Sequence, residues 1–196
     1  MHGLILRSFE GYIHNVYGTP VWERVVAQLD LGFSSFEPLF HYEDKVAQLL
    51  LDGCAAALDK PSDMLLEDFG TYMVADAQSE RVRRLLRFGG VDYEDFLRSL
   101  EDLPGRARLA VSDLDLPEIE LVEVGEGQFS VRSRAAIGRF GHVLTGMLRA
   151  LADDYGALVF IEHMGEDAGF EQISVQLLEA AFAQGRSFDL ASAVRG

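Results

Sequence analysis

The hydrophobic period changes once along this chain, and that change limits the fold more than any other feature. Up to Pro117, apolar residues recur three or four positions apart, which is the spacing of one helix face. After Pro117, Gly125-Glu126-Gly127 is preceded by Ile119, Leu121 and Val122 and followed by Phe129, Val131 and Ser133. This pattern is typical of a β-hairpin with a glycine-bearing turn. We therefore expect an α+β domain whose first half is helical.

Glycines and prolines divide the first half into short helices. A loop rich in Gly, Ser and Phe is expected over 31–39. The first expected helix covers about 3–17, and the second has Thr19 as N-cap and Pro20 in its first turn. Two more are expected over 42–58 and 62–74, followed by a short basic helix that is capped by Ser79 and ended by Gly89-Gly90. The last one begins at Tyr93 and continues through 96–109.

The second half returns to helical spacing over 135–155, followed by a second pair of strands. The strands are expected at 158–161 and 170–177, around an acidic, glycine-containing loop. Residues 183–196 are mostly small and polar, without a clear period. We expect one domain over 1–182, with a helical lobe over about 1–60 packed on a lobe of antiparallel strands and a long helix over about 61–182, and a tail over 183–196.

The charge of the chain excludes some partners. Its 32 acidic and 17 basic residues give a formal net charge of −15, which repels nucleic acid and anionic membrane surfaces. No apolar run approaches the ~18 residues of a membrane span, and the first residues do not form a signal peptide. The one cysteine, Cys54, has small and apolar neighbours that predict a buried, unreactive thiol. These features predict a cytoplasmic protein.

Motifs of common enzymes are missing from the sequence. It has no glycine-rich phosphate loop, nucleophile elbow, His-Glu-x-x-His or cysteine pair for zinc. The five histidines are scattered, and His14 and His142 fall on expected helices, where a partly buried structural histidine is the commoner case. The sequence does not predict an enzyme.

A set of short motifs, in order through most of the chain, resembles the haem-nitric-oxide/oxygen-binding (H-NOX) family. The motifs are Met1-His2-Gly3-Leu4-Ile5 with Phe9 one turn later, Tyr17-Gly18, Trp22-Glu23, Leu66-Glu67-Asp68-Phe69-Gly70, Phe96-Leu97-x-x-Leu100 and Pro117. The resemblance implies a pocket that holds a b-type haem, with iron bound by one histidine shortly after the Phe-Leu-x-x-Leu run. It also implies a Tyr-x-Ser-x-Arg pattern that holds the haem carboxylates.

This sequence departs from both patterns. Leu103-Pro104 stands where the resemblance places an apolar residue and the histidine, and no histidine occurs from Tyr42 to Gly141. Proline cannot bind iron. The second pattern keeps only Arg134 in one register and only Ser133 in the next. Pro104 predicts either a kink or break over 103–105, or a plain helix end with no functional meaning.

Two arginines remain as candidate anchors for an acid group. Arg132 and Arg134 alternate on one expected strand, so they share a face and could clamp a carboxylate. The alternative is an exposed strand face paired with Glu120 or Glu123. The expected pocket residues are Ile5, Phe9, Leu100, Pro104, Pro117, Arg132, Arg134 and Leu144.

The resemblance and its departures support two hypotheses. The first is a haem-less sensor or ligand-binding module that takes a small apolar ligand bearing an acid group, or none. By the resemblance it would act in trans on a signalling partner such as a histidine kinase or a cyclic-dinucleotide enzyme. The second is a haem-binding sensor of nitric oxide or oxygen with a different axial ligand, for which His142 is the only candidate. The cofactor is therefore left open.

Overall fold

The computed structural model describes residues 1–76, 80–87, 89–114, 116–135 and 138–182. It confirms the expected α+β class, because helices in the first half are followed by a four-stranded antiparallel sheet and a long helix. The expected cap at Ser79 and the tail over 183–196 lie outside the described residues.

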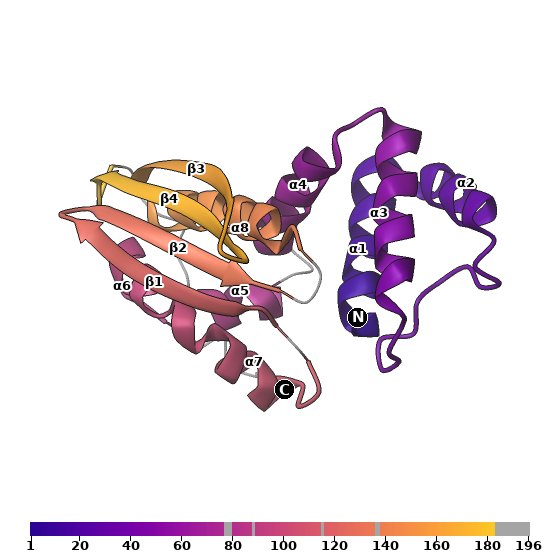
Figure 1. Cartoon of the computed structure of the whole chain (residues 1–196), viewed down its shortest axis with the longest axis horizontal. Helices are drawn as coiled ribbons and strands as arrows, with labels where there is room; N and C mark the ends of the chain where they lie inside the picture. Colours follow the sequence, from indigo (N-terminus) through magenta and orange to yellow (C-terminus); the bar gives the residue numbers. More distant parts are fainter. Residues whose placement is uncertain (77–79, 88, 115, 136–137, 183–196) are drawn as a thin grey trace, which may run out of the picture.

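Three helices form a layer at one end of the molecule, which we call the helical lobe (Figure 1): α1 (Gly3–Tyr17), α2 (Thr19–Leu29) and α3 (Asp44–Leu58). His2 caps α1 through its side chain, and Gly18 ends it with a φ of 92°. Gly18 is also the N-cap of α2, so Thr19 is not the cap that we expected. Its hydroxyl instead lies 3.1 Å from His14 Nδ1.

A fourth helix, α4 (Ser62–Ala75), lies between the helical lobe and the rest of the molecule (Figure 1). It contacts α1 and α3 on one side and packs closely on α8 (Phe140–Tyr155) on the other. A Cβ built on Gly70 would lie 2.0 Å from the Val143 carbonyl oxygen, and one on Gly146 would lie 1.9 Å from the Glu67 carbonyl oxygen. Glycine at both positions is therefore required by the close approach of the two backbones.

Among the described residues, the segment between α4 and the sheet contains three short helices and a 3-10 turn. These are α5 (Glu80–Arg87), α6 (Tyr93–Arg98), the turn η2 (Leu100–Asp102) and α7 (Leu103–Ala110). The continuous helix expected from Tyr93 onward is thus broken between α6 and α7. The inward residues Phe96, Leu97, Leu100 and Leu103 are all buried in the core.

The sheet has the strand order β1-β2-β4-β3, with antiparallel pairs throughout. Its strands are β1 (Glu118–Gly125), β2 (Gln128–Arg134), β3 (Leu158–Asp167) and β4 (Phe170–Glu179). Gly127 supplies the positive φ of the first turn, as expected. The loop expected after 161 is wrong, because pairing with β4 continues to Asp167 and only Ala168 and Gly169 form the turn, both at positive φ.

The sheet has one inner face and one outer face. Phe129, Val131 and Ser133 of β2 are buried, and α8 packs on this inner face (Figure 1). Gln128, Ser130, Arg132 and Arg134 alternate with them and lie on the outer face.

The helix α8 begins later than expected. It starts at Phe140 rather than Ala135, because Arg139 has a left-handed φ of 77° and forms the N-cap. Gly156 ends the helix, also in the left-handed region. Most of its residues are buried between α4 and the sheet.

Candidate functional site

Pro104 lies in the first turn of α7. A proline is tolerated there, because the amide that it lacks has no partner within the helix. The break between α6 and α7 lies before Pro104, over Ser99 and η2. Pro104 therefore lies at the start of a helix and does not interrupt one. Its ring is half-buried, whereas Leu100, Leu103 and Ala107 on the inward side are buried. The helix break that we expected over 103–105 thus lies just before Pro104, over 99–102, and the alternative of a helix end at Pro104 is wrong.

The other apolar residues expected at the pocket belong to the packed interior. Phe9, Leu100 and Leu144 are members of one continuous hydrophobic core. The Phe9 ring packs edge to face on Phe69, with ring centroids 5.2 Å apart. Ile5 and Pro117 are half-buried.

A surface hollow of about 280 Å³ lies elsewhere, between α1 and α4. It is lined by Tyr12, Val16, Asp68, Thr71 and Tyr72, none of which we had expected at a pocket. Burial strongly raises the pKa of the Tyr12 phenol, which lies 3.2 Å from the Tyr17 hydroxyl. The hollow is open to solvent and has a phenolic and acidic rim.

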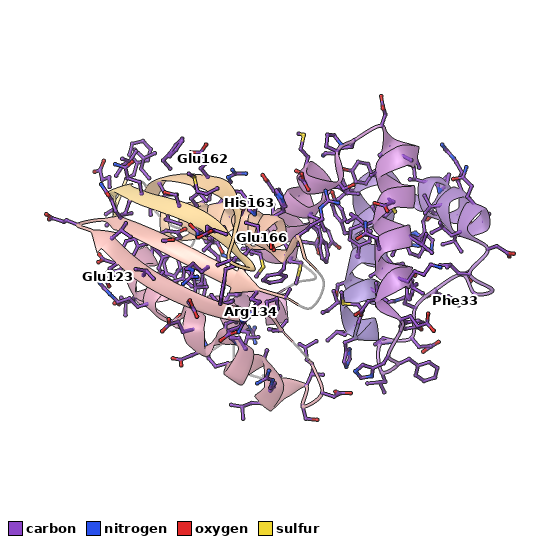
Figure 2. The ribbon with its side chains drawn as sticks, in the orientation of Figure 1. Phe33, Glu123, Arg134, Glu162, His163 and Glu166 are labelled. Carbon is purple, nitrogen blue, oxygen red and sulfur yellow. The ribbon has the colours of Figure 1, made fainter. Side chains whose placement is uncertain are left out.

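Arg132 and Arg134 lie on the outer face of the sheet (Figure 2 labels Arg134). Arg132 Nη1 donates to Glu120 Oε2 at 3.0 Å, and Arg134 pairs with Glu118 on the same neighbouring strand. Both guanidinium groups also stack over the Phe170 ring, at 4.3 and 4.7 Å. This is the exposed-face alternative. Glu123, the other partner considered, pairs with Arg98 instead.

Ser133, between these two arginines in sequence, points the other way. It is 1% exposed, and its Oγ has no hydrogen-bond partner among the described residues. It pairs with Ile119 on β1 and Glu171 on β4. Of the residues that match the Tyr-x-Ser-x-Arg pattern in either register, Ser133 is the one that lies on the inner face.

His142 lies where α4, α8 and the sheet meet, stacked on His163 of β3 with ring centroids 4.0 Å apart (Figure 2 labels His163). Its Nδ1 lies 3.3 Å from Glu67 Oε1 and its Nε2 lies 3.4 Å from Asp63 Oδ1. His163 Nε2 lies 3.3 Å from Glu171 Oε1.

The carboxylates around this pair have further partners. Glu171 accepts a hydrogen bond from the Gly141 amide at 2.9 Å, and a Cβ on Gly141 would collide with both Glu171 and His163. Burial opposes ionisation of Asp63, but the hydrogen bond from Arg139 and the nearby His142 lower its pKa overall. Through these carboxylates, the two histidines connect α4 and α8 to the sheet. This is the structural role that we expected for His142.

A second group of histidines lies at the start of the chain. His2, His41 and Asp113 each place a possible metal-ligand atom within 4.8 Å of the other two. His2 and His41 are joined by an isolated antiparallel β-bridge, and Asp113 follows α7. The sequence did not reveal this group, because its members are 39 and 72 positions apart. Only a prediction of their contacts could have found it.

The fold is an α+β domain in which helices pack on a four-stranded antiparallel sheet, and the comparisons with known proteins name its class. The Haem-NO-binding family (HNOB) matches residues 2–163. The chain therefore belongs to this family, the H-NOX domains, as the sequence motifs indicated.

Solved structures show the same fold at low identity. An H-NOX protein from K. algicida, solved in the Fe(II) unliganded state, has a TM-score of 0.75 and 17% identity, covering 94% of this chain and all of that one. An H-NOX protein from S. oneidensis in the Fe(II)NO state also has a TM-score of 0.75, with 16% identity, covering 91% of this chain and all of that one.

Curated relatives are much longer than this chain. Soluble guanylate cyclase 89Da of Drosophila melanogaster is 21% identical over 158 residues, which cover 81% of this chain and 24% of that protein. Soluble guanylate cyclase gcy-35 of Caenorhabditis elegans is 30% identical over 105 residues, covering 53% of this chain and 15% of that protein. The matched part thus spans about a quarter or less of each relative.

The residues present do not fit a haem bound in the manner that the family resemblance implies. Helix α7 has the sequence Leu-Pro-Gly-Arg-Ala-Arg-Leu-Ala, which contains no iron ligand. Both arginines of the expected carboxylate anchor lie on the outer face, and both ring nitrogens of His142 face acids of α4. Of the residues in that anchor pattern, only Ser133 offers a polar group, its unpartnered hydroxyl, on the inner face.

No helix among the described residues is both long enough and apolar enough to cross a membrane.

Proposed function

We propose that this chain is an H-NOX module that acts as a sensor or ligand-binding domain without haem bound in the family manner. One observation carries the proposal: Pro104 lies in the first turn of α7, and α7 has no side chain that can bind iron. The placement of Arg132 and Arg134 supports it, because the side chains that would hold the haem carboxylates pair with Glu120 and Glu118 instead.

The ligand class follows from what the inner face offers. The core around Leu100, Val131 and Leu144 is apolar, and Ser133 Oγ is an uncharged, buried group without a partner among the described residues. A ligand at this face would be small and apolar with at most one hydrogen-bonding group. An anionic ligand would find Arg132 and Arg134 on the opposite face of the sheet, and burying an unpaired charge is costly.

The output would be exerted on a separate protein. The sequence contains no glycine-rich phosphate loop, nucleophile elbow, His-Glu-x-x-His or cysteine pair for zinc. We propose regulation in trans of a signalling partner, such as a histidine kinase or a cyclic-dinucleotide enzyme, in the cytoplasm.

Haem reconstitution tests the main proposal. The protein is expressed with excess haem precursor, or mixed with haemin, then desalted, and its absorption spectrum is recorded. We expect no stoichiometric Soret band to survive desalting. A stable band at one haem per chain would contradict the proposal.

The alternative is a haem sensor that uses His142 as axial ligand. If haem does bind, the variant His142→Ala distinguishes the two cases, with His14→Ala as a control from a histidine of the helical lobe. Loss of the Soret band in His142→Ala alone would favour the alternative. Unchanged binding in both variants would exclude His142 as the ligand.

Regulation in trans is tested separately. Autophosphorylation of a candidate histidine kinase, or turnover by a candidate cyclic-dinucleotide enzyme, is measured with and without equimolar protein. A change of several-fold supports the proposal, and unchanged rates with every candidate partner argue against it.

A further inference from the structure

The His2 side chain is held firmly at the start of α1. Its Nδ1 accepts a hydrogen bond from the Leu4 amide at 3.1 Å, which caps the helix. Its ring meets the His41 ring edge to face, with centroids 4.9 Å apart and an angle of 72°. Only 3% of the side chain is exposed. The position of the second ring nitrogen, Nε2, is therefore determined by the fold.

His2 Nε2 is buried and has no hydrogen-bond partner among the described residues. It lies 3.4 Å from Asp113 Oδ1, an ion-pair contact that is longer than an ordinary hydrogen bond. Buried nitrogens almost always form hydrogen bonds, because a buried nitrogen without one has lost its bonds to water and gained nothing in return. A buried nitrogen without a short hydrogen bond, which lies beside a carboxylate and a second imidazole, therefore offers a donor atom to a further partner.

We propose that His2, His41 and Asp113 bind a divalent transition-metal ion of the Zn²⁺ type. Two imidazole nitrogens and one carboxylate oxygen form a donor set that Zn²⁺ takes in proteins, whereas Mg²⁺ and Ca²⁺ prefer oxygen ligands alone. The three ligand atoms already lie within 4.8 Å of one another, so small side-chain movements bring them around one ion. His41 and Asp113 are exposed, so water completes the coordination.

Metal binding at His2 Nε2 costs the hydrogen bond that caps α1. Because Nδ1 of His2 accepts from Leu4, the proton of a neutral ring lies on Nε2. A metal on Nε2 requires the neutral tautomer that is protonated on Nδ1, so the ring loses the hydrogen bond from Leu4. Metal binding therefore exchanges a helix cap for a metal bond. It also weakens with falling pH, because protonation of the histidines or of the carboxylate competes with the metal.

The site would connect parts of the chain that are distant in sequence. His2 precedes α1, His41 lies in the loop before α3, and Asp113 lies in the turn that follows α7. A bound ion would tie the helical lobe to the end of α7, the helix that carries Pro104. The site does not depend on the proposed absence of haem.

The other group of possible ligands, His142, His163 and Glu171, is a weaker candidate. Each ring nitrogen there faces a described group: His142 faces Glu67 and Asp63, and His163 faces Glu171 and the Gly165 amide. The two rings are also stacked nearly parallel, at 17°, so their lone pairs do not converge on one point. This group serves as the control.

The test uses the untagged full chain, freed of metal by dialysis against a chelator. Zn²⁺ binding is measured by calorimetry, and Co²⁺ binding by its visible absorption, which reports coordination geometry. The variants are His2→Asn, which keeps a capping side chain but lacks Nε2, Asp113→Asn on the exposed ligand, and His163→Gln as the matched control. Circular dichroism establishes that each variant is folded.

We expect one Zn²⁺ per chain, bound at least tenfold more weakly by His2→Asn and by Asp113→Asn, and unchanged in His163→Gln. Asp113→Asn alone decides the matter if His2→Asn does not fold, because Asp113 is on the surface. The proposal is overturned if no saturable binding occurs, if Asp113→Asn binds as the wild type does, or if His163→Gln abolishes binding.

Discussion

Replacing Gly146 by alanine tests whether the contact between α4 and α8 organises the molecule. The added Cβ would lie 1.9 Å from the Glu67 carbonyl oxygen and 2.8 Å from its carbonyl carbon. Both atoms belong to the backbone of α4, so no side chain can rotate away. Ordinary contact needs at least 3.4 Å, and the two helices must therefore separate by more than an ångström.

Two opposing effects set the magnitude of the change. Overpacking a tight contact costs ~1–3 kcal/mol and more where backbone must move. Alanine in a helix interior recovers ~1 kcal/mol relative to glycine. The hydrogen bond from Thr71 Oγ1 to the Gly146 carbonyl oxygen, 3.3 Å long, would also be strained. Since the clash involves backbone on both sides, we expect a net loss of about 2 kcal/mol in the free energy of unfolding.

Gly11→Ala is the matched control. Gly11 is also inside a helix, α1, but a Cβ there meets nothing within 4 Å. It should gain stability by ~0.5–1 kcal/mol. For a chain of this size, thermal melts should show Tm lowered by roughly 4–8 °C in Gly146→Ala and raised by a few degrees in Gly11→Ala. If the two variants shift Tm in the same direction and by similar amounts, the close approach of α4 and α8 is not the constraint that we infer.

Three further predictions concern a buried acid, the cysteine and the outer face of the sheet. Glu10 is 4% exposed and accepts hydrogen bonds from the Phe36 amide and from the Ser35 hydroxyl, each 2.9 Å long. In urea unfolding, Glu10→Ala should lower the free energy of unfolding by ~2 kcal/mol. The same change at the exposed Glu23 should leave it almost unchanged. Burial raises the pKa of the Cys54 thiol to about 12. Above pH ~9 the thiol is ionised in the unfolded chain but not in the folded one, so the unfolded chain binds fewer protons. Stability therefore falls as the pH rises. Between pH 7 and 10 the wild type should lose ~2 kcal/mol more than Cys54→Ala, and equal losses would contradict the burial of the thiol. Arg134→Ala should change stability by less than ~1 kcal/mol, because Arg134 and Glu118 are both about half exposed, and a larger loss would mean that the outer face is covered.

The helical first half could be predicted because its signals are local. The apolar spacing before Tyr17, the glycine after it and the proline at position 20 act within a few residues of themselves, and α1 has the expected bounds. Boundaries that depend on distant partners were wrong. The strand β3 runs six residues beyond the expected Ile161 because β4 pairs with it, which an acidic, glycine-containing sequence does not indicate.

The candidate sites depend on contacts that the sequence does not contain. Two alternating arginines share a face in any strand, but only the sheet's position against α8 decides that this face is the outer one. His2, His41 and Asp113 meet because the start of the chain lies between the loop before α3 and the turn after α7. Spacing along the chain holds no information about such a meeting.

The sequence by itself determined the α+β class, the family motifs and the presence of a proline at position 104, where the family resemblance implies an iron ligand. Those properties are local in the chain, since residue identity and hydrophobic period need no partner. The tertiary structure alone decided that Pro104 lies in the first turn of a helix and that Arg132 and Arg134 face outward. It also decided that a buried nitrogen of His2 lacks a hydrogen bond and lies beside Asp113. The physical reason is that burial and pairing depend on how distant segments pack together. Whether a side chain is buried or paired depends on which side of its element the other segment covers.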